Sequence, residues 1–311
     1  MMVRTVLGDV QPGELGATSC HEHLIIDSPF VAEHFPHIHL ASVEDAVIEL
    51  APWRRAGLGT VVDAMPAGQG RDIGRLAEIS QRSAVHVVAV TGLHTAKYYV
   101  DVPWALDPDP DDLVERFSEE IDQGADATSH RCGVIKVATG PDGVDDRARR
   151  VFAAAAETHR RTGAPLLSHC EEGRHATDQI QLLDTLGVPL DRVVLSHTDK
   201  VADIGYHTEL LGSGVNLEYD QALRQHPDEP RGSAWLMGRM AGAGFGRQLM
   251  LGTDGARRML WTALGGTPGL AWLFTGYAEI LSTYGIHAGI LNTILVDNPA
   301  RWLTFRSQQT P

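Results

Sequence analysis

The chain has 311 residues, with 26 Lys and Arg against 40 Asp and Glu, so its formal net charge of −14 excludes a nucleic-acid backbone or an anionic membrane as its main partner. Hydrophobic residues make up 43% of the sequence, as in an ordinary folded protein, yet no apolar run is long enough for a transmembrane helix and no apolar leader is apparent. Three cysteines are too few for a disulfide framework, so we expect a reducing, cytoplasmic setting.

One pattern recurs along the chain: a short apolar run, a polar or glycine-rich stretch, and then a segment with helical periodicity. Residues 1–16 are expected to form a hairpin-like lead-in to the first run. Nearly continuous apolar character is typical of strands that are buried on both faces of a parallel sheet. Eight runs have this character, and they cover residues 17–27, 58–67, 85–92, 132–140, 164–170, 191–199, 213–220 and 247–254.

Helices are expected between these runs, most clearly over residues 42–57, 109–124 and 146–163. Ser42 is a suitable capping residue for the first of them, and each of the three segments ends on glycine, the residue that most often terminates a helix. Eight strands that alternate with helices predict an α/β fold, a (β/α)8 TIM barrel, as a single domain over residues 1–311. A doubly wound sheet is the alternative, but no G-x-G-x-x-G motif follows the first run.

Residues that can bind a metal stand at the ends of five of the eight runs. The chain has 15 histidines, and four of them are in this group, together with one lysine and one aspartate: His21, His23, Lys136, His169, His197 and Asp254. The active site of such a barrel lies at the C-terminal ends of its strands, so these side chains are expected to meet at one mouth. Imidazole and carboxylate groups are common metal ligands. Each residue alone also fits a structural role, such as a hydrogen-bonded core histidine.

Lys136 is the unusual member of this group. Buried beside cations, its amine would have to be neutral, and a neutral amine can react with carbon dioxide to form a carbamate. The carbamate has the charge and shape of a carboxylate, and it could bridge two metal ions about 3.5–4 Å apart. The alternative is a lysine that pairs with an acid inside the barrel.

The segments CHEHL, GVIKVAT, LLSHC, VVLSHTD and LGTD resemble the phosphotriesterase-like family of the amidohydrolase superfamily. The opening TVLGDVQPGELGATSCHEHL and the ending VDNPARWLTF extend the resemblance over nearly the whole chain. The resemblance implies an enzyme that holds two divalent metal ions, with zinc expected and manganese, cobalt or iron as alternatives, and it also implies a homodimer. By this resemblance the more buried ion is held by His21, His23 and Asp254, the more exposed ion by His169 and His197, and both by carboxylated Lys136 and a hydroxide.

The expected reaction is hydrolysis of an ester-like bond in a small molecule. The bridging hydroxide would attack, and Asp254 would take the proton and pass it toward the leaving group. The family resemblance covers sugar lactonases, phosphotriesterases and hydrolases of hydrophobic acyl-homoserine lactones, and an amidase with the same centre is a further alternative. A non-catalytic metal-binding barrel is the alternative from another class.

Basic and phenolic residues follow three of the runs, and they bear on the substrate. Arg257 lies three residues after Asp254, Arg224 follows the seventh run, and Tyr98 and Tyr99 follow the third. The stretches DGARR and GGTPGLAWL resemble the sugar-lactonase subgroup, which implies that these residues contact an anionic group of a sugar lactone or its phosphate. Ion pairing with surface acids and loop packing are the structural alternatives, and an apolar pocket would instead favour a hydrophobic lactone.

Overall fold

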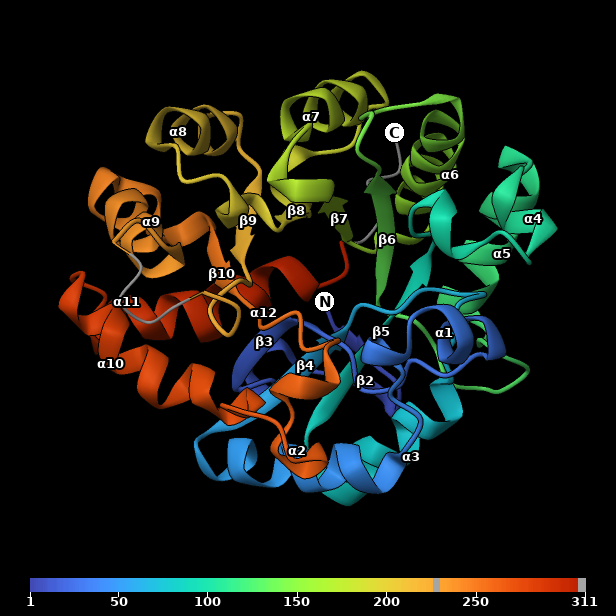
Figure 1. Cartoon of the computed structure of the whole chain (residues 1–311). Coiled ribbons are helices and arrows are strands. Elements are labelled where there is room, and N and C mark those ends of the chain that lie inside the picture. The colour runs from blue at the N-terminus through green and yellow to red at the C-terminus, as the bar shows by residue number, and fades with distance from the viewer. Residues whose placement is uncertain (226–229, 307–311) are drawn as a thin grey trace.

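Eight parallel strands form one sheet that closes into a barrel in the computed structural model, which describes residues 1–225 and 230–306 (Figure 1). The strands follow chain order around the barrel, and the last meets the first where the backbone N–H of Asp254 donates to the His21 carbonyl at 3.0 Å. This arrangement confirms the predicted (β/α)8 barrel. The strands are β3 (Ala17–Glu22), β4 (Leu58–Asp63), β5 (His86–Gly92), β6 (Val134–Thr139), β7 (Leu166–Cys170), β8 (Val193–Ser196), β9 (Asn216–Tyr219) and β10 (Leu249–Leu251).

Helices surround the barrel between successive strands (Figure 1). Ser42 caps the first long helix, because its hydroxyl accepts a hydrogen bond from the backbone N–H of Asp45 at 3.1 Å. Within residues 1–225 and 230–306, no helix combines the length and the apolar character needed to span a lipid bilayer. The α-helices are α1 (Pro29–His34), α2 (Val43–Arg55), α3 (Ile73–Ser83), α4 (Pro103–Leu106), α5 (Pro110–Asp122), α6 (Asp146–Thr162), α7 (Ala176–Thr185), α8 (Ile204–Gly212), α9 (Ser233–Met240), α10 (Gly276–Thr283), α11 (Ala288–Asn292) and α12 (Asn298–Leu303).

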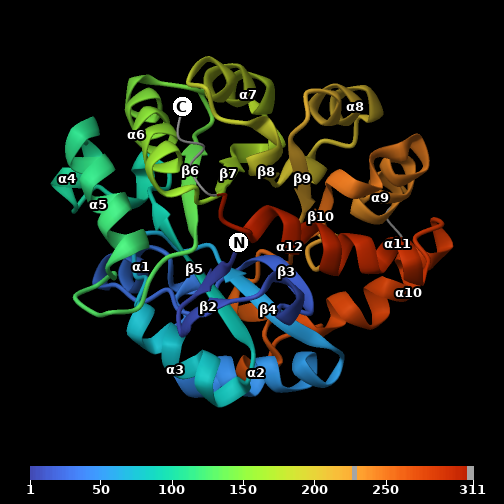
Figure 2. The same ribbon diagram turned by 180° about the vertical axis from the view of Figure 1, so that it is seen from behind.

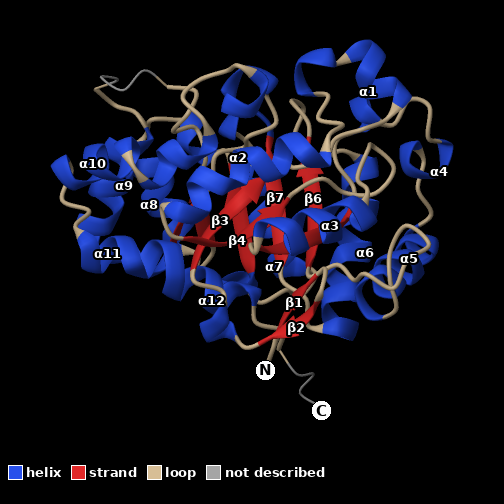
Figure 3. Cartoon of the chain, turned by 90° about the horizontal axis from the view of Figure 1, so that it is seen from below, coloured by secondary structure: helices blue, strands red, loops and turns tan. Residues whose placement is uncertain are grey.

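An apolar cluster fills the barrel toward the N-terminal ends of its strands. Val134, Leu167 and Val194 belong to this cluster, and Trp302 of α12 packs with them. The antiparallel hairpin of β1 (Val3–Thr5) and β2 (Gly8–Val10) lies at the same end, next to α12, whereas α1 lies at the opposite end (Figures 2 and 3). One end of the barrel is therefore closed, and the other carries the loops that follow the strands.

The barrel interior becomes polar toward the open end. Alternate residues of a strand point to the same face, so the side chains two positions after an apolar interior residue lie one layer higher. On β6, β7 and β8 the residues at these positions are Lys136, His169 and Ser196, all buried. The barrel interior thus has an apolar layer toward the N-terminal ends of the strands and a polar layer toward their C-terminal ends.

Candidate functional site

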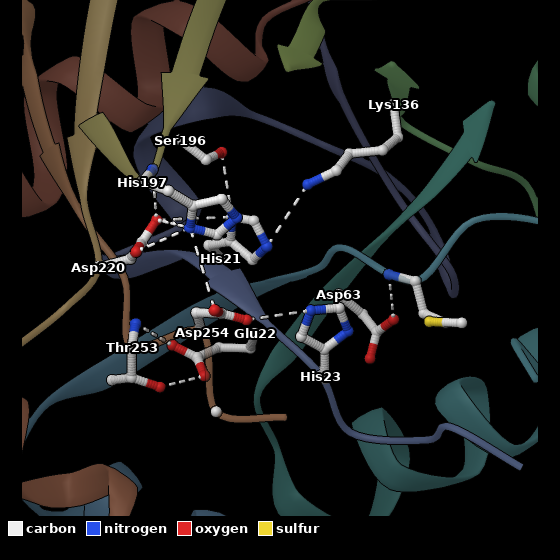
Figure 4. A network of polar contacts seen from close by, with 12 residues as sticks. His21, Glu22, His23, Asp63, Lys136, Ser196, His197, Asp220, Thr253 and Asp254 are labelled. Carbon is white, nitrogen blue, oxygen red and sulfur yellow. Dashed lines mark hydrogen bonds and ion pairs between the residues drawn. The ribbon is translucent and has the colours of Figure 1, made fainter. Parts of the chain in front are cut away.

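All six predicted metal ligands lie at the open end of the barrel, each at most 8% exposed: His21, His23, Lys136, His169, His197 and Asp254. Lys136 Nζ is 3.4 Å from His21 Nε2, and His23 Nε2 is 3.5 Å from Asp254 Oδ1 (Figure 4). The rings of His169 and His197 have centroids 4.5 Å apart, and those of His21 and His197 are 4.9 Å apart. Residues from five strands and strand ends therefore converge on one small region.

Two of these histidines each direct one ring nitrogen at a buried acid of β9 or its end. His21 Nδ1 is 3.2 Å from Glu218 Oε2, and His197 Nδ1 is 2.8 Å from Asp220 Oδ2 (Figure 4). A carboxylate on one ring nitrogen orients the imidazole and makes the other nitrogen a better metal ligand. Sequence reasoning missed both acids, although their i, i+2 spacing at the end of the seventh run is the same signal that identified His21 and His23.

His169 has a similar partner in the loop after β7. Its Nε2 is 2.6 Å from Glu171 Oε2, and Lys97 Nζ is 2.9 Å from the other oxygen of this carboxylate. The hydrogen bond with His169 lowers the pKa of Glu171 to about 2, and Lys97 adds to this effect. Glu171 is thus an ionised link between a candidate ligand and a cation of the pocket wall, and no sequence pattern indicated it.

Two of the candidate ligands have a backbone conformation that is unfavourable for residues other than glycine. His197 has a φ of +66° and Asp254 a φ of +45°. Such residues cost about 1–3 kcal/mol each and cluster at functional sites. Hydrogen bonds stabilise both backbone conformations. The backbone N–H of His197 donates to Asp220 Oδ2 at 2.9 Å, and the backbone N–H of Asp254 donates to the His21 carbonyl at 3.0 Å.

Glu22, the last residue of β3, lies between His21 and His23 and holds the loop that carries Asp254. Its carboxylate accepts hydrogen bonds from the backbone N–H, at 3.0 Å, and the hydroxyl of Thr253, the residue before Asp254 (Figure 4). Burial raises the pKa of Glu22 to about 8. The position of Asp254 therefore depends on a fully buried acid that sequence reasoning did not select.

Lys136 presents a buried amine to the cluster. Burial lowers its pKa to about 8, although Glu218 and Asp254 act in the opposite direction. The amine is therefore more often neutral near physiological pH than an exposed lysine, and a neutral amine is the reactive form. Gly92 allows β5 to approach this strand closely, since a Cβ at this position would lie 1.9 Å from the Lys136 carbonyl oxygen.

The cluster opens into a pocket of about 240 Å³ at the barrel mouth. Four cationic side chains line this pocket together with the phenol of Tyr98: Lys97, Lys200, Arg224 and Arg257. Arg224 also contacts the cluster, because its Nη1 is 2.7 Å from Asp254 Oδ2. Although burial alone would raise it, Arg224 and His23 hold the pKa of Asp254 well below its usual range, so the carboxylate is ionised.

The structure corrects the expectation for Tyr99, which lies in the core and not in the pocket. Its side chain is fully buried, its hydroxyl oxygen accepts from the backbone N–H of His94 at 2.9 Å, and the same hydroxyl donates to the Ala67 carbonyl at 3.2 Å. The 3-10 turn over Ala96–Tyr98 separates the two phenols, so only Tyr98 faces the mouth. Tyr99 positions the loop, whereas Tyr98 is available to a ligand.

His94, just beyond the end of β5, is a pocket residue that sequence reasoning overlooked. It lines the same pocket, and its ring centroid is 4.4 Å from that of His169. Its place after the apolar run of residues 85–92 was the available signal, because the other candidate histidines also stand at strand ends.

The sequence model of the Phosphotriesterase family matches residues 1–303. The chain belongs to this family. Over 97% of its length it is 29% identical to a protein named phospho-furanose lactonase from Mycoplasmopsis agalactiae, and the match covers 91% of that protein. It is also 29% identical, over 98% of both chains, to an N-acetyltaurine hydrolase from Tetraodon nigroviridis.

A solved structure supports the same fold. The lactonase from Listeria monocytogenes superposes with a TM-score of 0.92 at 24% identity, and the match covers 99% of this chain and 100% of that one. At this identity the match establishes the barrel architecture alone. The family match and the lactonase-named relative together identify this phosphotriesterase-family chain as a hydrolase.

Proposed function

We propose that this phosphotriesterase-family hydrolase is a lactonase that opens a sugar lactone or a phosphorylated sugar lactone. The observation that carries the proposal is that four cations, Lys97, Lys200, Arg224 and Arg257, line the same pocket as the histidine cluster, against three acids, Glu171, Glu172 and Asp254. These cations stand in a chain with a net charge of −14, so their concentration at the mouth favours an anionic substrate. The relative named phospho-furanose lactonase supports a lactone as that substrate.

The cluster also suits a pair of divalent metal ions. Ligand atoms of His21, His23 and Asp254 lie within 4.8 Å of one another, and we assign one ion to them. His169 and His197 would hold the second ion, and Lys136, as a carbamate, would bridge the two. The ring nitrogens of these histidines that do not meet acids remain available as ligands, which is the arrangement common in metal sites. Zinc suits such nitrogen and oxygen ligands, and so do manganese, cobalt and iron.

A second group of close ligand atoms comprises His21, His197 and Asp220. Asp220 is already occupied by the backbone N–H and Nδ1 of His197, at 2.9 and 2.8 Å. We therefore assign Asp220 to the orientation of His197 and not to the coordination of a metal.

Metal ions held in this cluster would lower the pKa of a water molecule and polarise the acyl oxygen of the substrate. Asp254 is ionised and reaches the centre of the cluster, so it takes the proton of the attacking water and passes it toward the leaving alkoxide. Arg257 and Tyr98, on the pocket wall, bind the anionic end of the substrate. Arg224 contributes both to the charge state of Asp254 and to the binding of that anion.

Hydrolysis of the amide bond of an N-acyl aminosulfonate is the second candidate, because the N-acetyltaurine hydrolase relative is as similar as the lactonase relative. A taurine amide is also anionic, so the cations of the mouth fit both substrates. Neutral phosphotriesters and acyl-homoserine lactones would make no use of the positive charge of these cations.

The test is a substrate panel measured with added zinc or manganese at neutral pH: sugar lactones with and without a phosphate, an acyl-homoserine lactone, a nitrophenyl phosphotriester and N-acetyltaurine. We expect the largest kcat/KM with a phosphorylated lactone. Arg257→Met should lower that kcat/KM by about 10- to 100-fold, because it removes one hydrogen bond to a charged group. The kcat/KM for the unphosphorylated lactone should fall less. Arg258→Met is the matched control for this discrimination, because Arg258 donates to the His39 carbonyl at 2.8 Å and does not line the pocket.

Each outcome of the panel decides between the candidates. Turnover of only long-chain neutral lactones or of the phosphotriester would contradict the anionic substrate. If N-acetyltaurine is the preferred substrate, the enzyme is an amidase and not a lactonase, and the cations keep their proposed role in binding an anion. Equal losses of discrimination in both arginine variants would refute the assignment of Arg257.

A further inference from the structure

We propose that His94 is a substrate-contacting residue, whose neutral ring donates a hydrogen bond from Nε2 to the oxygen that becomes negatively charged during hydrolysis. The identity of that oxygen, as the acyl oxygen of an ester, rests on the proposed function. The orientation of the donor rests on the contacts of His94 alone.

The tautomer of His94 follows from one hydrogen bond. The backbone N–H of Thr95 donates to His94 Nδ1 at 2.7 Å. A backbone amide can only donate, so Nδ1 is the acceptor and the proton of the neutral ring is on Nε2. The Thr95 hydroxyl, 3.1 Å from the same nitrogen, can donate to it as well. The residue is held from the other side as well, because its own backbone N–H donates to the Tyr99 hydroxyl at 2.9 Å. The loop thus fixes both the place of the ring and the position of its proton.

The location of the ring makes this proton available to a ligand. The ring centroid of His94 lies 4.4 Å from that of His169 and 4.9 Å from that of Tyr98, with its plane at 89° to the phenol. The residue lines the pocket that also contains His21 and Asp254. No hydrogen bond to Nε2 is found among residues 1–225 and 230–306, and the ring lines the pocket in contact with His169, so we take the Nε2–H to be available to a ligand beside a candidate metal ligand.

The chemistry of a neutral imidazole suits stabilisation of an oxyanion. Because Nδ1 accepts the Thr95 N–H, the ring carries a single proton, on Nε2, and is a neutral donor. A donor that is already oriented in a partly dry site needs no reorganisation when charge develops, and such a donor contributes about 10²–10³ in kcat. His94 would act by this hydrogen bond alone, without transfer of its proton.

Three substitutions separate the donor from the ring that carries it. Glutamine places an amide N–H near the position of Nε2 but lacks the ring, so His94→Gln keeps a donor. Phenylalanine keeps an aromatic ring against His169 but has no donor. Asparagine retains an acceptor for the Thr95 N–H at the position of Nδ1 and cannot reach the position of Nε2. The surface variant His34→Gln serves as the control for the loss of a histidine, because His34 is exposed on α1, where it contacts the Phe30 carbonyl and stacks on the Phe30 ring.

Kinetics and metal content are measured on the zinc-loaded full chain. We expect kcat to fall about 10²- to 10³-fold in His94→Phe and His94→Asn, with bound zinc unchanged, and less than about 10-fold in His94→Gln. Wild-type kcat in His94→Phe would overturn the proposal. Loss of zinc in all three variants would also overturn it, since His94 would then be a metal ligand. Equal losses in Gln, Phe and Asn without loss of zinc would show a packing role.

A binding measurement keeps this proposal separate from the proposed function. Methylphosphonate presents anionic oxygens and needs no turnover, and its affinity for the zinc-loaded protein is measured by calorimetry. We expect the affinity for methylphosphonate to fall about 10-fold or more in His94→Phe, which is the value of one hydrogen bond to a charged group. The affinity should be retained in His94→Gln. If the wild-type protein hydrolyses no lactone but the two variants differ in this way, the proposed function fails and the donor role of His94 stands. If His94→Phe and His94→Gln bind methylphosphonate with equal affinity, the donor role of His94 is refuted, whatever the substrate is.

Discussion

Asp220 offers the sharpest test of how the candidate metal centre is built. The carboxylate accepts the backbone N–H of His197 on Oδ2 at 2.9 Å and its Nδ1–H on Oδ1 at 2.9 Å, and the side chain is fully buried. Asparagine has the same shape but only one acceptor oxygen. Whichever way the amide turns in Asp220→Asn, its NH2 group opposes one of the two N–H groups of His197.

The expected loss follows from this geometry. One hydrogen bond that involves a charged group contributes about 1.5–3 kcal/mol, which corresponds to about 10- to 150-fold in a binding constant. Substitutions of residues that orient metal ligands cost about 10- to 100-fold in metal affinity. We therefore expect Asp220→Asn to weaken zinc binding by about 10- to 100-fold.

The assay is competition for zinc with a chelating dye, on wild type, Asp220→Asn and a control. Glu49→Gln is the matched control, because Glu49 is a fully buried carboxylate that accepts the Ala263 and Leu270 backbone N–H groups, at 2.9 and 2.8 Å, away from the cluster. The control should lower the melting temperature and leave the zinc Kd unchanged. A zinc Kd within twofold of wild type in Asp220→Asn would refute the orienting role. A loss beyond about 10³-fold would exceed the effect of an orienting residue and identify Asp220 as a ligand.

Three further changes test the site and its scaffold. Asp254→Asn should lower kcat by about 10²- to 10⁴-fold, the contribution of a general acid or base, and wild-type activity in this variant would contradict the mechanism. Arg71 is a fully buried side chain paired with Glu120 at 2.8 Å and Asp126 at 2.7 Å, so Arg71→Met should lower the free energy of unfolding by about 3–5 kcal/mol in calorimetry. The double variant Arg71→Met/Glu120→Gln should recover part of this loss, and no recovery would refute the unpaired charge as its cause. Burial lowers the pKa of His207, so below about pH 6.5 the unfolded chain binds a proton there that the folded chain does not, and the free energy of unfolding should fall as the pH drops. His207→Gln should make this fall shallower. Identical slopes of unfolding free energy against pH in wild type and variant, measured by chemical denaturation, would contradict this prediction.

The barrel and the convergence of the candidate ligands could be predicted because both follow from topology. Parallel strands bring their C-terminal ends to one side, so His21 on β3 and Lys136 on β6 are neighbours although 115 residues separate them. Apolar runs and the residues at their ends are local features of sequence. Neither the exact strand bounds nor the side-chain contacts were needed for this prediction.

The partners of those residues could not be predicted, because they depend on loop geometry. Glu171 meets His169 through a 3-10 turn after β7, in which Glu172 has a φ of +54°. Tyr98 and Tyr99 are identical in type and adjacent in sequence, and only the turn that precedes Tyr99 decides which phenol faces the pocket. Sequence periodicity applies to strands and helices, and it carries no information on such turns.

The distribution of buried charge gives an independent reason for a cationic occupant of the barrel mouth. Glu22, Glu218, Asp220 and Asp254 are all buried near the cluster, with Lys136 as their cation in the barrel interior. Burial raises the pKa values of Glu22 and Glu218, which means that the protein alone does not fully stabilise these acids as anions. Divalent ions would supply the missing positive charge, and their binding would release protons and stabilise the fold. Of the four cations of the pocket wall, Arg224 and Lys97 pair with Asp254 and Glu171, so the attraction of a negatively charged substrate would fall mainly to Lys200 and Arg257.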